Sequence, residues 1–189
     1  MTTSASSTSF DEVSCIIPGL YLSGLSIARN SAKLAELKIS HIVCCCTWTE
    51  FPERDEVPGL PYLRIDIEDM SREPIELFFD EACDFIAESL ENHEGVLVHC
   101  RSGVSRSSTI VLSFLVKSMG MRIFDAFFLL RSKRGIVTPN IGFMNKLLDL
   151  EQNTLGFKSV SIQRYSLWYT SDSRPAIPDI EERTQPNTE

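Results

Sequence analysis

The chain has 189 residues and 43% hydrophobic content, enough for one domain with its own core and short tails. Its formal net charge of −8 argues against nucleic acid as a substrate, because phosphate-backbone binding depends on Lys and Arg. No apolar run approaches the roughly 18–20 residues that span a bilayer, and the Ser/Thr-rich start does not resemble a secretory signal. A cytoplasmic or nuclear protein without a membrane span is therefore expected.

The first half of the chain alternates short apolar runs with amphipathic segments. Its predicted elements are a disordered tail at 1–12, two short strands around a Pro-Gly turn at 16–24, a helix at 31–37, a buried strand at 42–46, a proline-rich loop at 49–61, a strand at 62–67 and a helix opened by Pro74.

The second half is predicted to be mostly helical. A buried strand at 96–98 is followed by a helix at 107–119 with Gly120 as C-cap, a helix at 122–134, and a helix with Thr138 as cap and Pro139 as first residue. From residue 158 the pattern weakens; a short strand through Val160, Ile162, Leu167 and Tyr169 is expected, then disorder.

Strands that alternate with helices favour a single α/β domain, with a central mixed, mostly parallel sheet flanked by helices. We expect a phosphatase-like domain at 13–157 and, at 158–189, an extension that is first packed and then disordered.

The six cysteines do not form a disulfide framework. Cys44, Cys45 and Cys46 are consecutive within a strand-like run, where free cysteine acts as a small hydrophobic residue. No CxxC pair accompanies a histidine cluster, so no zinc site is predicted. Cys100 differs from the other five because of its neighbours.

Residues 99–107, His-Cys-Arg-Ser-Gly-Val-Ser-Arg-Ser, are the most informative segment. A strand, a tight loop and a helix N-terminus form an anion-binding cradle, because successive backbone N–H groups point inward and the helix dipole favours negative charge. This cradle carries a thiol at Cys100 and a guanidinium at Arg106. The phosphate-binding residues are expected to be Arg101, Ser102, Gly103, Val104, Ser105 and Arg106.

Each chemical group of this loop has an expected role. The amides, the helix N-terminus and the nearby cation favour the thiolate of Cys100, which is the nucleophilic form. Arg106 can bind two phosphoryl oxygens with its planar fork, and Gly103 keeps the loop free of side-chain bulk. Ser107 is expected to donate a hydrogen bond to the sulfur, and His99 to support the loop by hydrogen bonding rather than to transfer protons.

The general acid is expected at the same edge of the sheet, since ligands gather beyond the carboxyl ends of parallel strands. The strand at 62–67 is followed by two acidic residues, and Asp69 continues the phase of its buried face. We expect Asp69 to act as general acid and then as general base. Asp66 and Glu68 are expected to be solvated charges.

These residues resemble the cysteine-dependent protein tyrosine phosphatase superfamily, in its small atypical dual-specificity branch. The similarity covers about residues 17–157. It is carried by the general-acid segment at 62–69, the signature loop at 99–107, and a Pro-Asn-x-Gly-Phe element at 138–143, while 177–180 looks like the tail of a few compact atypical members.

The resemblance implies hydrolysis of phosphotyrosine and phosphoserine/phosphothreonine monoesters in phosphorylated proteins. Cys100 would form a cysteinyl-phosphate intermediate that water releases, no metal or cofactor is implied, and Asn140 would support the signature loop. Two other hypotheses stay open: a phosphoprotein-binding module with negligible turnover, and a sulfurtransferase or redox enzyme. The oligomeric state is open as well.

The basic residues Arg131, Lys133 and Arg134 end the helix predicted at 122–134. We interpret them as a charge cluster at a helix C-terminus, where cations are favourable, rather than as a docking motif.

Overall fold

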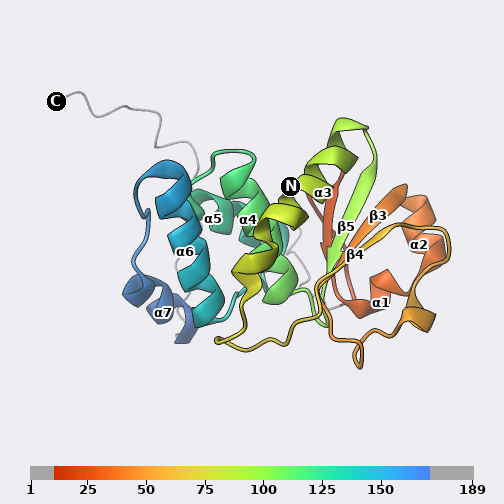
Figure 1. The fold of residues 1–189 in the computed structure, drawn as a ribbon, viewed down its shortest axis with the longest axis horizontal. Helices are drawn as coiled ribbons and strands as arrows, with labels where there is room; N and C mark the ends of the chain where they lie inside the picture. Colours follow the sequence, from red (N-terminus) through yellow and green to blue (C-terminus); the bar gives the residue numbers. More distant parts are fainter. Residues whose placement is uncertain (1–10, 171–189) are drawn as a thin grey trace, which may run out of the picture.

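The computed structural model describes residues 11–170 and builds them around one five-stranded sheet (Figure 1). The spatial order is β1-β2-β5-β3-β4; only β1 is antiparallel to its neighbour, and the other pairs are parallel. The strands are β1 Ser14–Ile17, β2 Leu20–Ser23, β3 Ile39–Cys44, β4 Tyr62–Arg64 and β5 Gly95–His99. The predicted mixed, mostly parallel α/β sheet is confirmed.

Helices cover both faces of this sheet. In Figure 1, α1 and α2 lie on one side, and α3 and α4 lie on the other, with α5, α6 and α7 packed beyond α4. The bounds are α1 Leu25–Ala28, α2 Ser31–Glu36, α3 Phe79–Glu91, α4 Arg106–Lys117, α5 Ile123–Lys133, α6 Ile141–Leu155 and α7 Ile162–Thr170, with 3₁₀ turns η1 Glu53–Asp55 and η2 Ile75–Phe78. No helix among residues 11–170 is long and apolar enough to cross a membrane.

The central strand β5 positions the signature loop. All five of its residues are buried, because it pairs with β2 on one side and β3 on the other and has helices above and below. Such strands are nearly continuous apolar runs, as Val96, Leu97 and Val98 are here. The helix after the loop, α4, is buried at every residue from 106 to 116. The loop between β5 and α4 is therefore fixed at both ends by the core.

The start of α6 differs from the prediction. Its N-cap is Asn140, whose side-chain oxygen accepts a hydrogen bond from the Phe143 N–H at 2.9 Å, and Ile141 is the first helical residue. Asparagine is a stronger N-cap than threonine, so Thr138 and Pro139 lie before the helix and not within it.

The C-terminal segment also differs, because α7 is a helix and not the predicted strand. Its Trp168 ring stacks on Phe127 of α5 at 6.0 Å, and its Tyr165 hydroxyl donates to the Pro139 carbonyl at 2.5 Å. Leu167 is exposed, so the apolar residues follow a helical repeat and not an alternation. The domain boundaries at residues 12 and 157 stay predictions, and the tail motif at 177–180 lies outside the described residues.

Candidate active site

Cys100 follows the last residue of β5 and is only 1% exposed. Its sulfur accepts hydrogen bonds from the Gly103 N–H at 3.2 Å and from the Ser107 hydroxyl at 3.1 Å. The loop thus curls around the sulfur, and the first turn of α4 supplies the second donor. Two hydrogen-bond donors are therefore directed at one sulfur atom at the start of the loop.

Gly103 is required by the path of this loop. Its φ angle of +68° lies in the left-handed region, and a Cβ atom there would lie 2.6 Å from the carbonyl oxygen of Ser23. Any other residue would be strained and would displace the backbone beside Cys100.

The carbonyl groups of the loop point away from the cradle. Four successive carbonyls accept hydrogen bonds from outside it, so the intervening N–H groups are left to face inward, as anion binding requires. The Leu25 N–H donates to the Arg101 carbonyl at 3.2 Å, and the Thr138 N–H donates to the Val104 carbonyl at 2.9 Å. Between them, the Arg134 side chain donates from Nη2 to the Ser102 carbonyl and from Nε to the Gly103 carbonyl, both at 2.9 Å.

Arg134 thus binds two of these carbonyls. Its interpretation as part of a charge cluster at the end of a helix is therefore wrong. Its side chain is buried, and its remaining nitrogen Nη1 donates to the carbonyl of Glu12 at 2.9 Å. Burial lowers the pKa of Arg134. The sequence places this arginine at the end of a helix, but only the fold shows that it turns back to the loop.

Arg106 is 4% exposed and forms a two-point ion pair with Glu50, at 2.5 and 3.1 Å. It also donates to the carbonyl of Ile67 at 3.0 Å. Burial works to lower the pKa of Arg106, but the hydrogen bond to Glu50 and the attraction of nearby acidic groups together outweigh it, so the pKa is raised and the group stays charged. Within residues 11–170, the Nε of Arg106 is buried without a hydrogen-bond partner.

The sequence does not indicate Glu50, which lies 56 residues before Arg106. Partial burial works to raise the pKa of Glu50, but the bonds to Arg106 hold it below its ordinary value. A carboxylate six residues beyond a buried strand is a weak signal, and only the sheet topology brings it to the loop.

Asp69 is docked on the same loop although its residue is exposed. One carboxylate oxygen accepts hydrogen bonds from the Ser105 hydroxyl at 2.6 Å and from the Asn140 amide at 2.8 Å. The Asn140 backbone N–H in turn donates to the Ser105 oxygen at 3.0 Å. Asp66 and Glu68 are exposed. Asn140 therefore contacts both the loop and the carboxylate.

The segment that carries Asp69 also packs against α6. A Cβ atom at Gly142 would overlap the backbone carbonyl oxygen of Ser71. The glycine in the first turn of α6 thus lets the acidic segment lie directly on the helix.

His99 does not support the loop in the way the sequence predicts. In the described part of the chain, neither of its ring nitrogens has a hydrogen-bond partner. The ring packs edge-on against Phe51, with centroids 4.9 Å apart, and the backbone carbonyl accepts a hydrogen bond from the Cys45 N–H at 2.8 Å. Arg101, which the sequence predicts among the phosphate-binding residues, is exposed.

The fold and the loop define a domain of the cysteine-dependent phosphatase class. The profile of the family "Dual specificity phosphatase, catalytic domain" matches residues 20–153, so the chain belongs to this family. The resemblance stated from the sequence is thereby confirmed.

Named relatives agree with this placement. The chain is 37% identical to human dual specificity protein phosphatase 9 over 73% of its length, but it spans only 36% of that protein. It is 36% identical to dual specificity protein phosphatase 1 of Arabidopsis thaliana, over 74% of this chain and 69% of the relative. The crystal structure of human tyrosine phosphatase-like serine/threonine/tyrosine-interacting protein superposes with a TM-score of 0.69 at 33% identity, over 76% and 97% of the two chains.

Proposed function

We propose that this chain hydrolyses phosphotyrosine and phosphoserine/phosphothreonine monoesters of phosphorylated proteins through a cysteinyl-phosphate intermediate. The observation that carries the proposal is the arrangement around the loop: a sulfur with two hydrogen-bond donors, carbonyls bound from outside the loop, and a charged arginine at the far end. Family membership supports the same chemistry.

In this proposal Arg106 holds the phosphoryl group. Glu50 occupies its two terminal nitrogens, which leaves Nε–H as a buried donor without a partner in the described protein. An unpaired buried donor is costly, and a phosphoryl oxygen in the cradle would satisfy it. The ion pair also fixes the plane of the guanidinium before the substrate arrives.

The first step transfers the phosphoryl group to the enzyme. The thiolate of Cys100 attacks phosphorus, the S–P bond forms, and the bond from phosphorus to the ester oxygen breaks. Asp69, in its carboxylic acid form, gives its proton to the leaving oxygen. The product is a protein hydroxyl and a phosphorylated cysteine.

The second step releases phosphate. Asp69, now a carboxylate, takes a proton from water, whose oxygen attacks phosphorus while the S–P bond breaks. The Ser107 hydroxyl already donates to the sulfur and would stabilise the thiolate as it leaves. Ser105 and Asn140 hold the carboxylate of Asp69 against the loop for both steps.

The test is hydrolysis of an aryl phosphate and of phosphotyrosine and phosphothreonine peptides by the full chain. Cys100→Ser should abolish turnover, whereas Cys83→Ser, at a buried thiol outside the loop, should leave it unchanged. Equal rates for the wild type and Cys100→Ser would refute the proposal. Turnover of only one peptide class would restrict the specificity.

A phosphoprotein-binding module is the second candidate, and it is favoured by the similarity to a structural relative that is named as an interacting protein. Binding needs the loop but not the acid. If Asp69→Ala leaves turnover unaltered while phosphopeptides still bind, the binding function gains support over catalysis.

The cysteines support a reducing compartment. All six are free thiols, and free thiols are usual in the cytoplasm and nucleus, where disulfides are rare. We therefore propose that the protein is located in the cytoplasm or the nucleus.

A further inference from the structure

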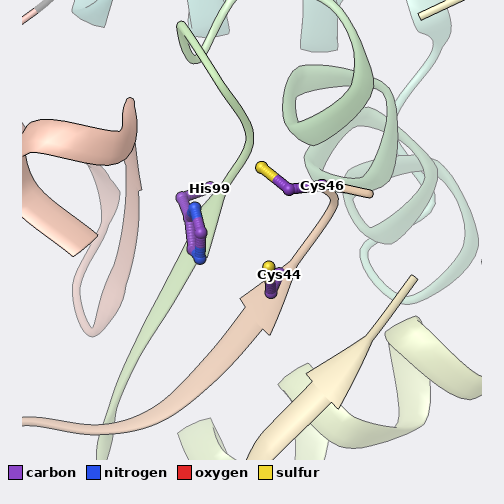
Figure 2. A group of neighbouring side chains, drawn as sticks. All are labelled: Cys44, Cys46 and His99. Carbon is purple, nitrogen blue, oxygen red and sulfur yellow. The ribbon is translucent and has the colours of Figure 1, made fainter. Parts of the chain in front are cut away.

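Two cysteines and a histidine that the proposed reaction does not use meet in the core beside the signature loop. Figure 2 shows Cys44, Cys46 and His99 gathered where β3 and β5 end. One thiol sulfur from each cysteine and one ring nitrogen of His99 lie within 4.8 Å of one another, and all three residues are buried.

The sheet explains why these side chains converge. Cys44 and His99 are directly paired in the parallel register of β3 and β5, so their side chains share one face. Cys46 lies two residues beyond Cys44, just past the end of β3, and its thiol lies beside the other two side chains. The sequence predicts no zinc site, since it contains no CxxC pair; the strand pairing supplies the histidine instead.

A second observation is that the imidazole of this cluster has no hydrogen-bond partner for its ring nitrogens in the described part of the chain. His99 is fully buried, and neither ring nitrogen has a hydrogen-bond partner among residues 11–170. A buried imidazole whose two nitrogens are both unpaired is rare, because each unpaired polar atom costs free energy. A metal ion bound to one nitrogen would remove part of this cost.

We propose that Cys44, Cys46 and His99 form a buried Zn²⁺ site. Thiolate and imidazole are the ligands that zinc prefers, and tetrahedral zinc at its usual bond lengths separates its ligand atoms by about 3.5–3.8 Å. The observed separations of up to 4.8 Å are close to this, so the side chains need to approach by roughly 1 Å. The fourth position is left for a water molecule or another small ligand.

Charge favours a divalent ion at this place. On binding, the two thiols release their protons to solvent, and two thiolates with one Zn²⁺ and a neutral imidazole have no net charge, which limits the cost of burial. The positive charge of Arg64 lies near Cys44 and that of Arg106 lies near Cys46. Each guanidinium is already paired with a carboxylate, Arg64 with Glu56 and Arg106 with Glu50. The bound ion would join β3 to β5 immediately before the nucleophile.

The experiment uses the full chain with Cys100→Ser, so that metal on the nucleophile cannot be mistaken for the new site. The reduced, metal-free protein is titrated with Co²⁺ and then with Zn²⁺. We expect one equivalent of Co²⁺ with thiolate-to-cobalt absorption in the near ultraviolet and tetrahedral bands in the visible, both removed by one equivalent of Zn²⁺. Zinc should also raise the melting temperature.

Single variants identify the ligands. Cys44→Ser and Cys46→Ser should each weaken zinc binding by more than about 100-fold, because losing a ligand costs more than losing an outer partner of one. Cys83→Ser removes a buried thiol elsewhere and should leave affinity unchanged. Should the ligand variants unfold, X-ray absorption of zinc-loaded Cys100→Ser protein must show two sulfur neighbours and one imidazole nitrogen.

Four results would overturn the site. The first is that folded Cys100→Ser protein does not bind zinc stoichiometrically, and the second is that both ligand variants keep the zinc affinity unchanged. The third is a zinc environment that contains only oxygen and nitrogen, and the fourth is binding of Cu⁺ without any binding of Zn²⁺.

Discussion

The carboxylate of Glu50 holds both terminal nitrogens of Arg106, at 2.5 and 3.1 Å, across 56 residues of sequence. The pair fixes the plane of the guanidinium, and its Nε–H has no hydrogen-bond partner among the described residues. Arg106 is therefore held by a residue that lies outside the loop.

Glu50→Gln is expected to lower kcat/KM for an aryl phosphate by about 100-fold, the size of effect that a misplaced catalytic group produces. The amide keeps the shape of the carboxylate but can accept from only one guanidinium nitrogen and carries no charge. Glu56→Gln is the matched control, because it removes a similar two-point ion pair with Arg64 outside the loop. Steady-state kinetics that show equal losses for both variants would contradict the positioning role.

The same pair predicts a dependence of stability on pH. The pKa of Glu50 in the folded chain lies below its ordinary value of 4.5, with burial opposing and Arg106 producing the shift. A lowered folded pKa stabilises the protein above the ordinary value, and this contribution is lost as the pH falls through the lowered one. The stability gap between the wild type and Glu50→Gln should thus be full near neutral pH and shrink below pH 4.5. Urea unfolding at several pH values measures it, and a gap that widens in acid would be inconsistent with this assignment.

Arg134→Lys is expected to impair the loop while keeping the charge. Lysine has one nitrogen in place of the three from which Arg134 donates to the carbonyls of Gly103, Ser102 and Glu12, and each buried acceptor left unpaired costs about 1–3 kcal/mol. The variant should bind vanadate more weakly and lose stability, whereas Lys133→Ala at the exposed neighbouring position should do neither. Vanadate inhibition that is identical in the wild type and Arg134→Lys would show that the arginine does not shape the cradle.

The parts of the site that the sequence predicts are those that are contiguous in the chain. Cys100, Gly103, Arg106 and Ser107 stand in one nine-residue segment whose strand and helix flanks are plain from apolar pattern. Asp69 follows from the phase of a strand, although only Tyr62–Arg64 of that segment forms β4.

The rest depends on contacts between distant segments. Glu50 reaches Arg106 because the sheet brings the segment after β3 to the loop, and Arg134 reaches the loop because α5 ends beside it. No local pattern in the sequence indicates either contact. The histidine of the proposed zinc cluster lies two strands away in sequence from its cysteines, and only the pairing of β3 with β5 unites them. The helix α7 forms where aromatic rings of α5 offer a surface, which a weak local pattern does not show.

Gly142→Ala is expected to slow leaving-group protonation more than substrate binding. The added methyl group would meet the Ser71 carbonyl and push away the segment that carries Asp69. Since an acid–base group contributes roughly 10²–10⁴-fold, kcat should fall by about ten-fold or more. The loss should be larger for phenyl phosphate than for para-nitrophenyl phosphate, whose leaving group needs no proton. Asn153→Ala, on the exposed face of α6, controls for helix substitution; a loss independent of the leaving group would contradict the mechanism.

Tyr165→Phe is expected to destabilise the domain without changing its active site directly. The Tyr165 hydroxyl donates to the Pro139 carbonyl at 2.5 Å, and both the ring and this bond are buried. Removing the hydroxyl leaves the carbonyl unpaired, so the free energy of unfolding should fall by about 1–3 kcal/mol. The urea midpoint should drop with an unchanged slope. Leu167→Ala, at an exposed position two residues away, should leave the midpoint in place, and a midpoint equally unmoved by Tyr165→Phe would mean that the hydrogen bond to Pro139 adds nothing to the stability of the domain.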